Sequence, residues 1–256
     1  MNNKAQLTGF GAPKYDVEAS IAALLHCEPL MPLSDLSQKV ERQLNYASPE
    51  TRKRYRRAII GTLIPNDGVR TSEVNSLAAF VKVIQERKAR VEAILYHILR
   101  GNKALMNICL SLANRFANVR IDRSVVRQLF IGTSEKAAYE TVKKAFRILR
   151  DFGLVQSQPE ERIMWRSPSI ESFAYILYDY YTSIGAVAPD LREIEDNDYL
   201  RASFFHRVGI LEAIQQGNSI WWVRERRPPL DRIIFRYGSL AEFLDSVVRT
   251  RNGYGT

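Results

Sequence analysis

Cysteine and histidine are scarce in this chain. Among its 256 residues there are two cysteines and three histidines. Cys27 and Cys109 are too few and too far apart for a disulfide framework or a thiolate metal site, and they suit a reducing compartment. His26, His97 and His206 are isolated from one another, so no His-x-x-x-His metal pair is present. We therefore expect neither a metal ion nor another cofactor.

Long apolar runs and catalytic signatures are also absent. No window approaches the roughly 18 consecutive apolar residues of a spanning helix, and the opening MNNKAQLTGFGAPKYD contains no apolar core of a signal peptide. We expect no membrane insertion and a cytoplasmic location. The sequence has no Gly-rich phosphate loop, Gly-x-Ser-x-Gly elbow or Cys-x-x-Cys pair. These absences predict a protein that is not an enzyme.

Positive charge is what the chain has in excess. Lys and Arg number 37 against 28 Asp and Glu, which gives a formal net charge of +9. Such a surplus favours an anionic partner, with nucleic acid first and an anionic membrane surface second. At this length, with 46% hydrophobic residues, the chain can bury a core as one large domain or two modest ones.

Apolar residues recur at helical spacing through the first half. The pattern predicts a short helix around residues 17–27 and another over residues 34–45. Ser48 then supplies an N-cap, with a proline after it, for a third helix. The apolar pattern from Thr71 to Phe116 predicts two long helices divided at Gly101-Asn102.

The segment from Ile121 to Arg166 is the most informative. IDRSVVRQLFIG predicts a short helix, TSEKAAYETVKKAFRILRDFG a longer one, and LVQSQPEERIMWR two short strands. Helix, turn, helix and hairpin is the order of a winged helix-turn-helix. A tyrosine-rich helix follows from Ser167, and DNDYLRASFFHRVGILEAIQQG predicts one further helix before a second hairpin.

Together these patterns predict a mainly α fold: a helical bundle with winged helix-turn-helix-like parts and short β-hairpins. We divide it into an N-terminal helical, helix-turn-helix-like region at 1–70, helices and a winged helix at 71–166, and a C-terminal helical region at 167–256. The hairpins are expected at 154–166 and 219–236. A helix followed by a hairpin thus occurs twice, with no repeat at the level of residues.

The stretch SPETRKRYRRAIIGTL is strongly cationic, since five of the six residues from Arg52 to Arg57 are basic. Only Glu50 and Asp67 are acidic neighbours in sequence. Like charges at this density repel one another, which a bound anion would relieve. The alternative is that Arg52 and Arg56 lay their stems over the core edge and meet acids from another helix. The candidate phosphate-binding residues here are Arg52, Lys53, Arg54, Arg56 and Arg57.

The longer helix of the winged segment presents a second cationic group away from its apolar stripe. Long basic side chains at this pitch suit the phosphates that flank a DNA groove. The alternative is a solvated face, because Glu135, Glu140 and Asp151 are interspersed. In the wing, Arg162 is a further candidate, opposed by the acids at the tip. The candidates on the helix are Lys136, Tyr139, Lys143, Lys144, Arg147 and Arg150.

The C-terminal hairpin has a third basic group beside two tryptophans. Strand alternation predicts that one of Trp221 and Trp222 faces the core and the other the opposite side. An outward tryptophan could stack on a base, although a partly buried structural one is the commoner case. The basic residues are Arg224, Arg226, Arg227, Arg232 and Arg236.

Three segments, SPETRKRYRRAIIGTL, VEAILYHILRGNKALMNICLSLANRF and VKKAFRILRDFGLV, together resemble the BrxA proteins of bacterial bacteriophage-exclusion (BREX) defence systems. The resemblance covers roughly residues 15–165 and contains no catalytic signature. It implies a small helical accessory protein with winged-helix-like parts. Such a protein would bind double-stranded DNA, without nuclease or methyltransferase activity, beside other BREX defence proteins. The resemblance identifies no functional residue in this chain.

The main expectation is therefore duplex DNA held largely through phosphates, with weak or shape-based specificity. A second hypothesis is an assembly adaptor whose basic surfaces meet acidic faces of partner proteins. A third is an RNA-binding protein that stacks bases on Tyr55, Tyr139 and the tryptophans. A metal-dependent nuclease ranks last, because no carboxylate cluster is assembled. Homo-oligomer formation stays open.

Overall fold

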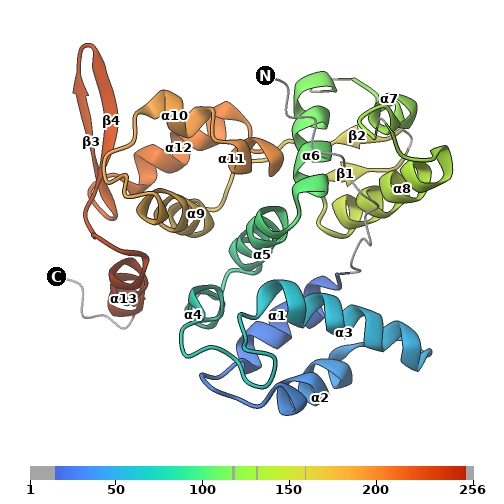
Figure 1. Cartoon of the computed structure of the whole chain (residues 1–256). Coiled ribbons are helices and arrows are strands. Elements are labelled where there is room, and N and C mark those ends of the chain that lie inside the picture. Colours follow the sequence, from blue (N-terminus) through green and yellow to red (C-terminus); the bar gives the residue numbers. More distant parts are fainter. Residues whose placement is uncertain (1–14, 117–118, 131, 159, 252–256) are drawn as a thin grey trace.

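The computed structural model describes residues 15–116, 119–130, 132–158 and 160–251, and it confirms the mainly α fold (Figure 1). Both predicted hairpins are present as two-stranded antiparallel sheets. The helices and hairpins are arranged as three units of the same design, joined by helices that belong to none of them.

The first unit contains three helices and a tight hairpin. The helices are α1 (Val17–His26), α2 (Leu33–Gln43) and α3 (Pro49–Leu63), and residues 64–72 turn back on themselves after α3. The extended segment before α2 pairs with the second arm of this hairpin. The amide of Thr71 donates to the carbonyl of Met31 (2.9 Å), and that of Leu33 donates to Val69 (2.9 Å). The order is helix, extended segment, helix, helix, hairpin.

The second unit repeats that order. It consists of α6 (Lys103–Arg115), α7 (Arg123–Arg127), α8 (Glu135–Asp151) and the strands β1 (Val155–Gln156) and β2 (Arg162–Ile163). The amide of Ile121, before α7, donates to the carbonyl of Glu161 (2.8 Å), so the segment before the second helix again joins the second arm of the hairpin. Ser134 caps α8, and Gly153 closes it at a φ of +68°, which favours glycine. The predicted hairpin and helix order are confirmed.

The third unit was only partly predicted. It consists of α9 (Ile170–Ser183), α10 (Leu191–Glu195), α11 (Asp198–Ala202), α12 (Arg207–Gly217) and the strands β3 (Trp222–Arg227) and β4 (Leu230–Phe235). The segment before α10 pairs with β4, because Ile233 donates to the carbonyl of Pro189 (3.2 Å) and Phe235 to that of Val187 (3.0 Å). We call residues 17–72, 103–163 and 170–235 the first, second and third winged units.

The prediction of one continuous helix before the second hairpin was wrong. Phe204 adopts a φ of +54°, which ends α11, and His206 begins α12 by accepting the amide of Gly209 on Nδ1 (2.8 Å). The side chain of Phe204 is fully buried, so its packing fixes this backbone turn. The break turns one expected helix into α11 and α12, the last two of the four helices of the third unit.

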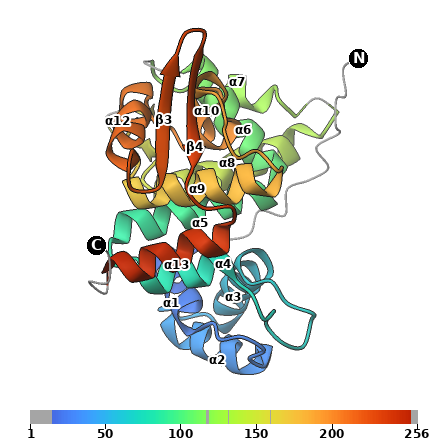
Figure 2. The same ribbon diagram turned by 90° about the vertical axis from the view of Figure 1, so that its left-hand side faces the viewer.

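Three helices lie outside the winged units: α4 (Ser76–Val83), α5 (Arg87–Gly101) and α13 (Leu240–Arg251). Helix α5 packs against α3, α6 and α9, and α13 packs against both α4 and α9. Figure 2 shows α13 lying between α9 and the helices of the first unit. The expected break at Asn102 is confirmed, since this residue caps α6. A second break, at residues 84–86, was missed, so the region expected to hold two helices holds three.

Both tryptophans of the C-terminal hairpin are buried, which corrects the prediction that one faces outward. Trp222 is 0% exposed and Trp221 is 8% exposed. Trp221 precedes β3, so strand alternation does not apply to it. Its carbonyl accepts the hydroxyl of Tyr178, and its ring lies edge-on to Phe243 at 5.7 Å. The pair therefore belongs to the core and offers no platform for a base.

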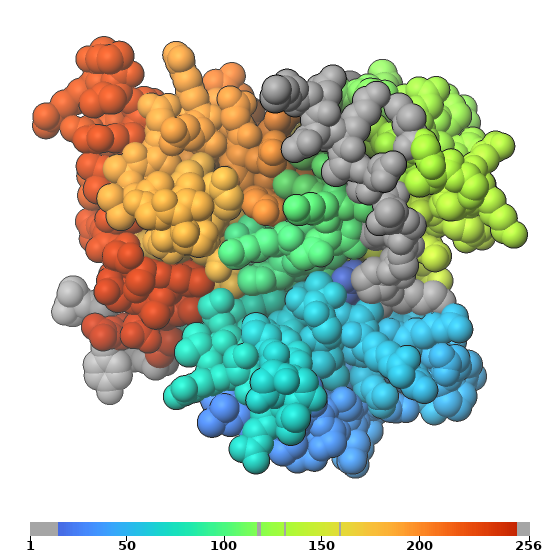
Figure 3. Space-filling view, in the orientation of Figure 1, coloured from blue at the N-terminus to red at the C-terminus, as the bar shows by residue number. Residues whose placement is uncertain are grey.

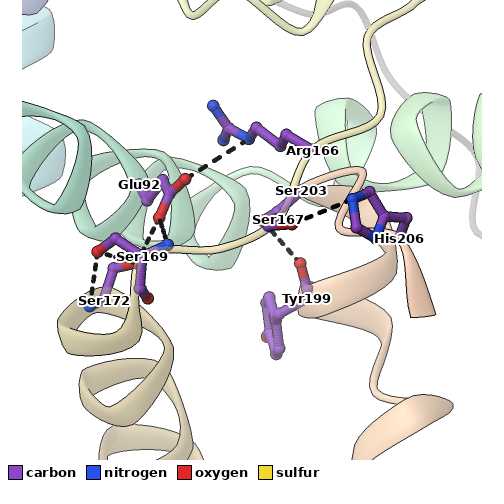
Figure 4. Close-up of polar contacts among 8 residues, drawn as sticks. All are labelled: Glu92, Arg166, Ser167, Ser169, Ser172, Tyr199, Ser203 and His206. Carbon is purple, nitrogen blue, oxygen red and sulfur yellow. Dashed lines mark hydrogen bonds and ion pairs between the residues drawn. The ribbon is translucent and has the colours of Figure 1, made fainter. Parts of the chain in front are cut away.

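A buried ion pair lies where the second unit meets the third (Figure 4). Glu92 of α5 accepts the amide of Ser169 (2.8 Å) and the hydroxyl of Ser172, and lies 3.8 Å from Arg166. Burial raises the pKa of Glu92, while Arg166 and the two hydrogen bonds lower it. The backbone of Arg166 pairs with residues 204 and 206. One carboxylate thus ties α5 to the start of the third unit.

The predicted division after residue 70 falls in the hairpin that ends the first unit, and the division after residue 166 falls between β2 and α9. Among the helices in the described residues, none is long and apolar enough to cross a membrane.

Candidate nucleic-acid interface

Helix α3 begins at the predicted cap, since Ser48 accepts the amide of Thr51. Its apolar face is buried against the neighbouring helices, so the cations emerge from the other sides. Arg52 donates to the carbonyl of Tyr46 (2.6 Å) and lies 3.8 Å from Glu41, and Arg56 also pairs with Glu41. The alternative interpretation holds for these two arginines. Their acidic partner, Glu41, lies on α2, a different helix from the arginines.

The other three cations of this cluster remain available. Arg54 lies 3.5 Å from Glu50, but both side chains are more than half exposed, so the pair contributes little. Lys53 and Arg57 form no ion pair with any described residue. By helical spacing, Lys53 and Arg57 lie on the side of α3 opposite Tyr55. They face away from the core and can meet an anion.

Helix α8 carries the second predicted cluster on one exposed face. Its buried side comprises residues such as Val142, Phe146 and Leu149. The predicted cations recur at intervals of three, four and seven residues on the other side, and all of them are exposed. Lys144 lies at the border of this face. The exposed side chains are Lys136, Tyr139, Lys143, Lys144, Arg147 and Arg150.

These cations are loosely paired or free. Lys143 lies 3.9 Å from Glu140 and Arg147 lies 4.0 Å from Asp151, both at the limit of an ion pair. Burial raises the pKa of Asp151, against the opposing effect of Arg147 and Arg150. In the described part of the chain, Lys136 and Lys144 have no ionic partner.

Tyr139 lies between two cations. Its ring is 48% exposed, with the guanidinium of Arg127 and the ammonium of Lys143 each 5.9 Å from its centroid. Arg127 comes from α7 and was missed by sequence reasoning. The signal was available in part, because α7 and α8 were predicted as consecutive helices of one winged segment. Their packing places Arg127 beside the cationic face of α8.

The two predicted clusters lie on helices that touch. Arg147 donates to the hydroxyl of Tyr55 (3.0 Å), across 92 positions of sequence. Tyr55 stacks on Tyr46 at 4.5 Å, and Tyr46 donates to Asp16 (2.9 Å). Tyr55 is therefore a buried link between α3 and α8, and not an exposed stacking residue. The free cations of α3 lie on the side of that helix opposite Tyr55 and therefore away from this contact.

The wing is less basic than its sequence suggests. Arg162 is exposed but lies 3.0 Å from Glu160, and Glu161 is held by Arg123. Arg123 also stacks its guanidinium on Phe146 at 4.7 Å. The acids at the wing therefore have structural partners, and Arg162 is a weaker candidate than the cations of α8.

No family model, curated protein or solved structure matches the chain. The resemblance to the BrxA proteins remains a prediction from the residues. Within the described residues there is no group of three His, Cys, Asp or Glu side chains placed to hold a metal ion.

Proposed function

We propose that this chain binds double-stranded DNA, mainly through phosphates, and does not catalyse a reaction. One observation carries the proposal: α8, the third helix of the second winged unit, exposes a face of cations that are free or loosely paired. In helix-turn-helix proteins the recognition helix of the motif enters the major groove. Lys136, Lys143, Lys144 and Arg150 would contact the flanking phosphates, with Tyr139 between them.

Helix α3 supports the same function from the first winged unit. It occupies the equivalent third position, with Arg54 and Arg57 exposed and Lys53 half-buried. Arg52 and Arg56 have a different role, since their contacts to Glu41 hold α2 against α3. Neither basic face has Arg, Asn or Gln side chains spaced to form hydrogen bonds with successive base edges, so we expect weak or shape-based specificity.

The proposed biological setting rests on the resemblance of three segments to the BrxA proteins. On that basis we propose an accessory protein of a bacterial anti-phage (BREX) system, acting in the cytoplasm beside other defence proteins. The RNA-binding alternative loses support, because Tyr55, Trp221 and Trp222 are buried. Of its proposed stacking residues, Tyr139 alone is exposed.

The test is a fluorescence-anisotropy titration of a labelled duplex over a salt series. Two charge reversals are compared with the wild type: Lys136→Glu/Lys144→Glu on α8 and Lys53→Glu/Arg57→Glu on α3. Affinity should fall as salt rises, because phosphate contacts release counter-ions. Each pair should weaken binding and flatten the log–log salt dependence by about two, one for each lost contact.

The matched control is Arg226→Glu/Arg227→Glu on the β3–β4 hairpin, which changes charge equally at two exposed positions far from α8. It should leave the salt slope nearly unchanged. Wild-type protein that does not bind duplex at low salt would overturn the proposal. So would a control that weakens binding as much as the α8 pair, since only net charge would then matter. Preference for single-stranded RNA in competition would select the RNA alternative.

A further inference from the structure

The third winged unit has the design of the other two with one additional helix, but the helix before its hairpin is not basic. Its equivalent helix, α12, contains one cation, Arg207, which lies 3.0 Å from Glu195. The exposed positions of α12 also include Val208, Glu212 and Gln215. Such a face does not suit DNA. The exposed part of this unit that projects furthest is instead its hairpin, β3 and β4 (Figure 1).

The outer face of this hairpin is less polar than the solvent-facing side of an antiparallel pair usually is. Near the base of the hairpin the inner face is core, with Trp222, Ile233 and Phe235 buried. On the outer face, Val223 and Ile234 lie directly opposite each other and are 46% and 37% exposed. Solvent-facing positions of an antiparallel pair are normally polar. This cross-strand aliphatic pair leaves apolar area exposed to solvent, where a partner could cover it.

Arginines surround this aliphatic pair. Alternation places Arg227, Arg232 and Arg236 on the outer face, with Glu225 as the one acid among them. Arg232 and Arg227 both pair with Glu225, at 2.8 and 3.5 Å. Arg236 is exposed and has no ionic partner in the described part of the chain. Three cations and one anion give the outer face a net positive charge around an apolar centre.

We propose that the outer face of the β3–β4 hairpin is a docking surface for an acidic, amphipathic segment of a partner protein. Aliphatic side chains of the segment would cover Val223 and Ile234, and its carboxylates would meet the arginines at the edge. A duplex would leave the apolar pair unused. A second copy would oppose like charges, and a hairpin of six-residue strands offers much less than the roughly 800 Å² per partner of a standard interface.

The position of the hairpin allows both partners to bind together. In Figure 1 the hairpin lies at the left edge, whereas α3 and α8 lie on the right, and the space-filling view of Figure 3 shows the same separation. Figure 2 views the molecule from the hairpin side, with β3 and β4 in front of α9. An occupant of the outer face would therefore not contact the proposed DNA-binding helices. The docking surface does not depend on DNA binding, and it can be tested without DNA.

The experiment selects binders to the full-length wild-type chain from a displayed library of random 16-residue peptides. Enriched peptides should alternate Asp or Glu with aliphatic residues. A labelled enriched peptide is then titrated against Val223→Thr/Ile234→Thr, which removes apolar surface while retaining high β-propensity. We expect affinity to fall at least about tenfold, the size of one or two lost aliphatic contacts. Arg236→Glu should weaken the same peptide.

The matched control is Val74→Thr, at a valine that is 77% exposed and lies before α4. It should bind the peptide like the wild type. Failure to enrich acidic amphipathic peptides would overturn the proposal, as would a selected peptide whose affinity is unaffected by the threonine pair. If the threonine pair instead weakens duplex binding, the face is a nucleic-acid contact. If it abolishes a dimer seen by light scattering, the occupant is a second copy.

Discussion

At the scale of single residues, several side chains that resemble functional groups are structural. His97 is one of these: its Nε2 atom lies 2.8 Å from the hydroxyl of Tyr175, inside the packing of α5 on α9. Cys27 and Cys109 are buried, as the sequence predicted, and burial raises the pKa of both thiols. These groups stabilise the fold and have no place in the proposed DNA contact.

The buried imidazole of His97 leads us to expect that the free energy of unfolding depends on pH. Burial lowers its pKa to about 4 from the usual 6.5, so the folded protein keeps the imidazole neutral while the unfolded chain takes up a proton. The unfolded state binds more protons between those values, and stability should therefore decrease as pH falls from 6.5 towards 4. The decrease from this group is at most about 1.4 kcal/mol per pH unit. Urea unfolding at pH 7, 6 and 5 should show a smaller decrease for His97→Gln. Equal slopes for the two proteins would contradict this assignment.

Alanine substitutions at two glycines, Gly217 and Gly61, should change the stability of the protein in opposite directions. A Cβ at Gly217 would lie 2.1 Å from the ring of Trp222, which is fully buried and whose indole N–H donates to Ile214. Gly61, within α3, has open space around the same position. Gly217→Ala should therefore destabilise the protein by about 1–3 kcal/mol through overpacking. Gly61→Ala should stabilise it by about 0.5–1 kcal/mol. Chemical denaturation of both variants checks the pair, and a destabilised Gly61→Ala would be inconsistent with this view of α3.

At the scale of helices and strands, local signals predicted most of the first and second winged units. The cap at Ser48 and the apolar stripes of α3 and α8 are local signals within single helices, and these helices formed as expected. The breaks at residues 84–86 and 203–206 were missed. The second depends on Phe204 taking a left-handed conformation because its side chain is buried. Tertiary packing decides such a turn, and no local pattern marks it.

The candidate site, too, could be predicted only in part from the sequence. Periodicity correctly placed the cations of α8 on an exposed face, since exposure follows from the buried stripe. It could not show which cations are neutralised, because the partners lie on other elements. Glu41 on α2 forms ion pairs with Arg52 and Arg56, and Arg147 contacts Tyr55, which is 92 positions away in the sequence. Charge in a sequence indicates potential contacts, and only the packing shows which charges remain free.

At the scale of the whole molecule, the winged units are held together by helices and buried polar contacts between them. The Glu92 and Arg166 pair is the central one, because it connects α5 to the segment that enters the third unit. Both side chains are largely shielded from water, Glu92 almost completely. A charge in this environment is costly once its partner is removed.

Glu92→Ala should therefore be strongly destabilising, by about 3–5 kcal/mol. The variant leaves Arg166 without its carboxylate and Ser169 and Ser172 without their acceptor. Hydrogen exchange should accelerate at residues 166–172 and 204–206 before the rest of the chain. The control is Glu18→Ala, which removes an exposed pair with Arg87 and should cost under about 1 kcal/mol. Similar effects of the two variants would mean that the buried pair does not stabilise the junction.

Helix α13 has a consequence for how the protein is made. It follows the third winged unit, yet it packs against α4, which follows the first, and its Phe243 stacks on Tyr178 of α9 at 4.5 Å. During synthesis on the ribosome, the apolar surface of α4 must wait for residues 240–251 to emerge. Each winged unit can form its local contacts as it leaves the exit tunnel, but α4 stays incompletely covered until most of the chain has been translated. A nascent chain stalled before residue 240 should therefore expose this surface and be bound by chaperones.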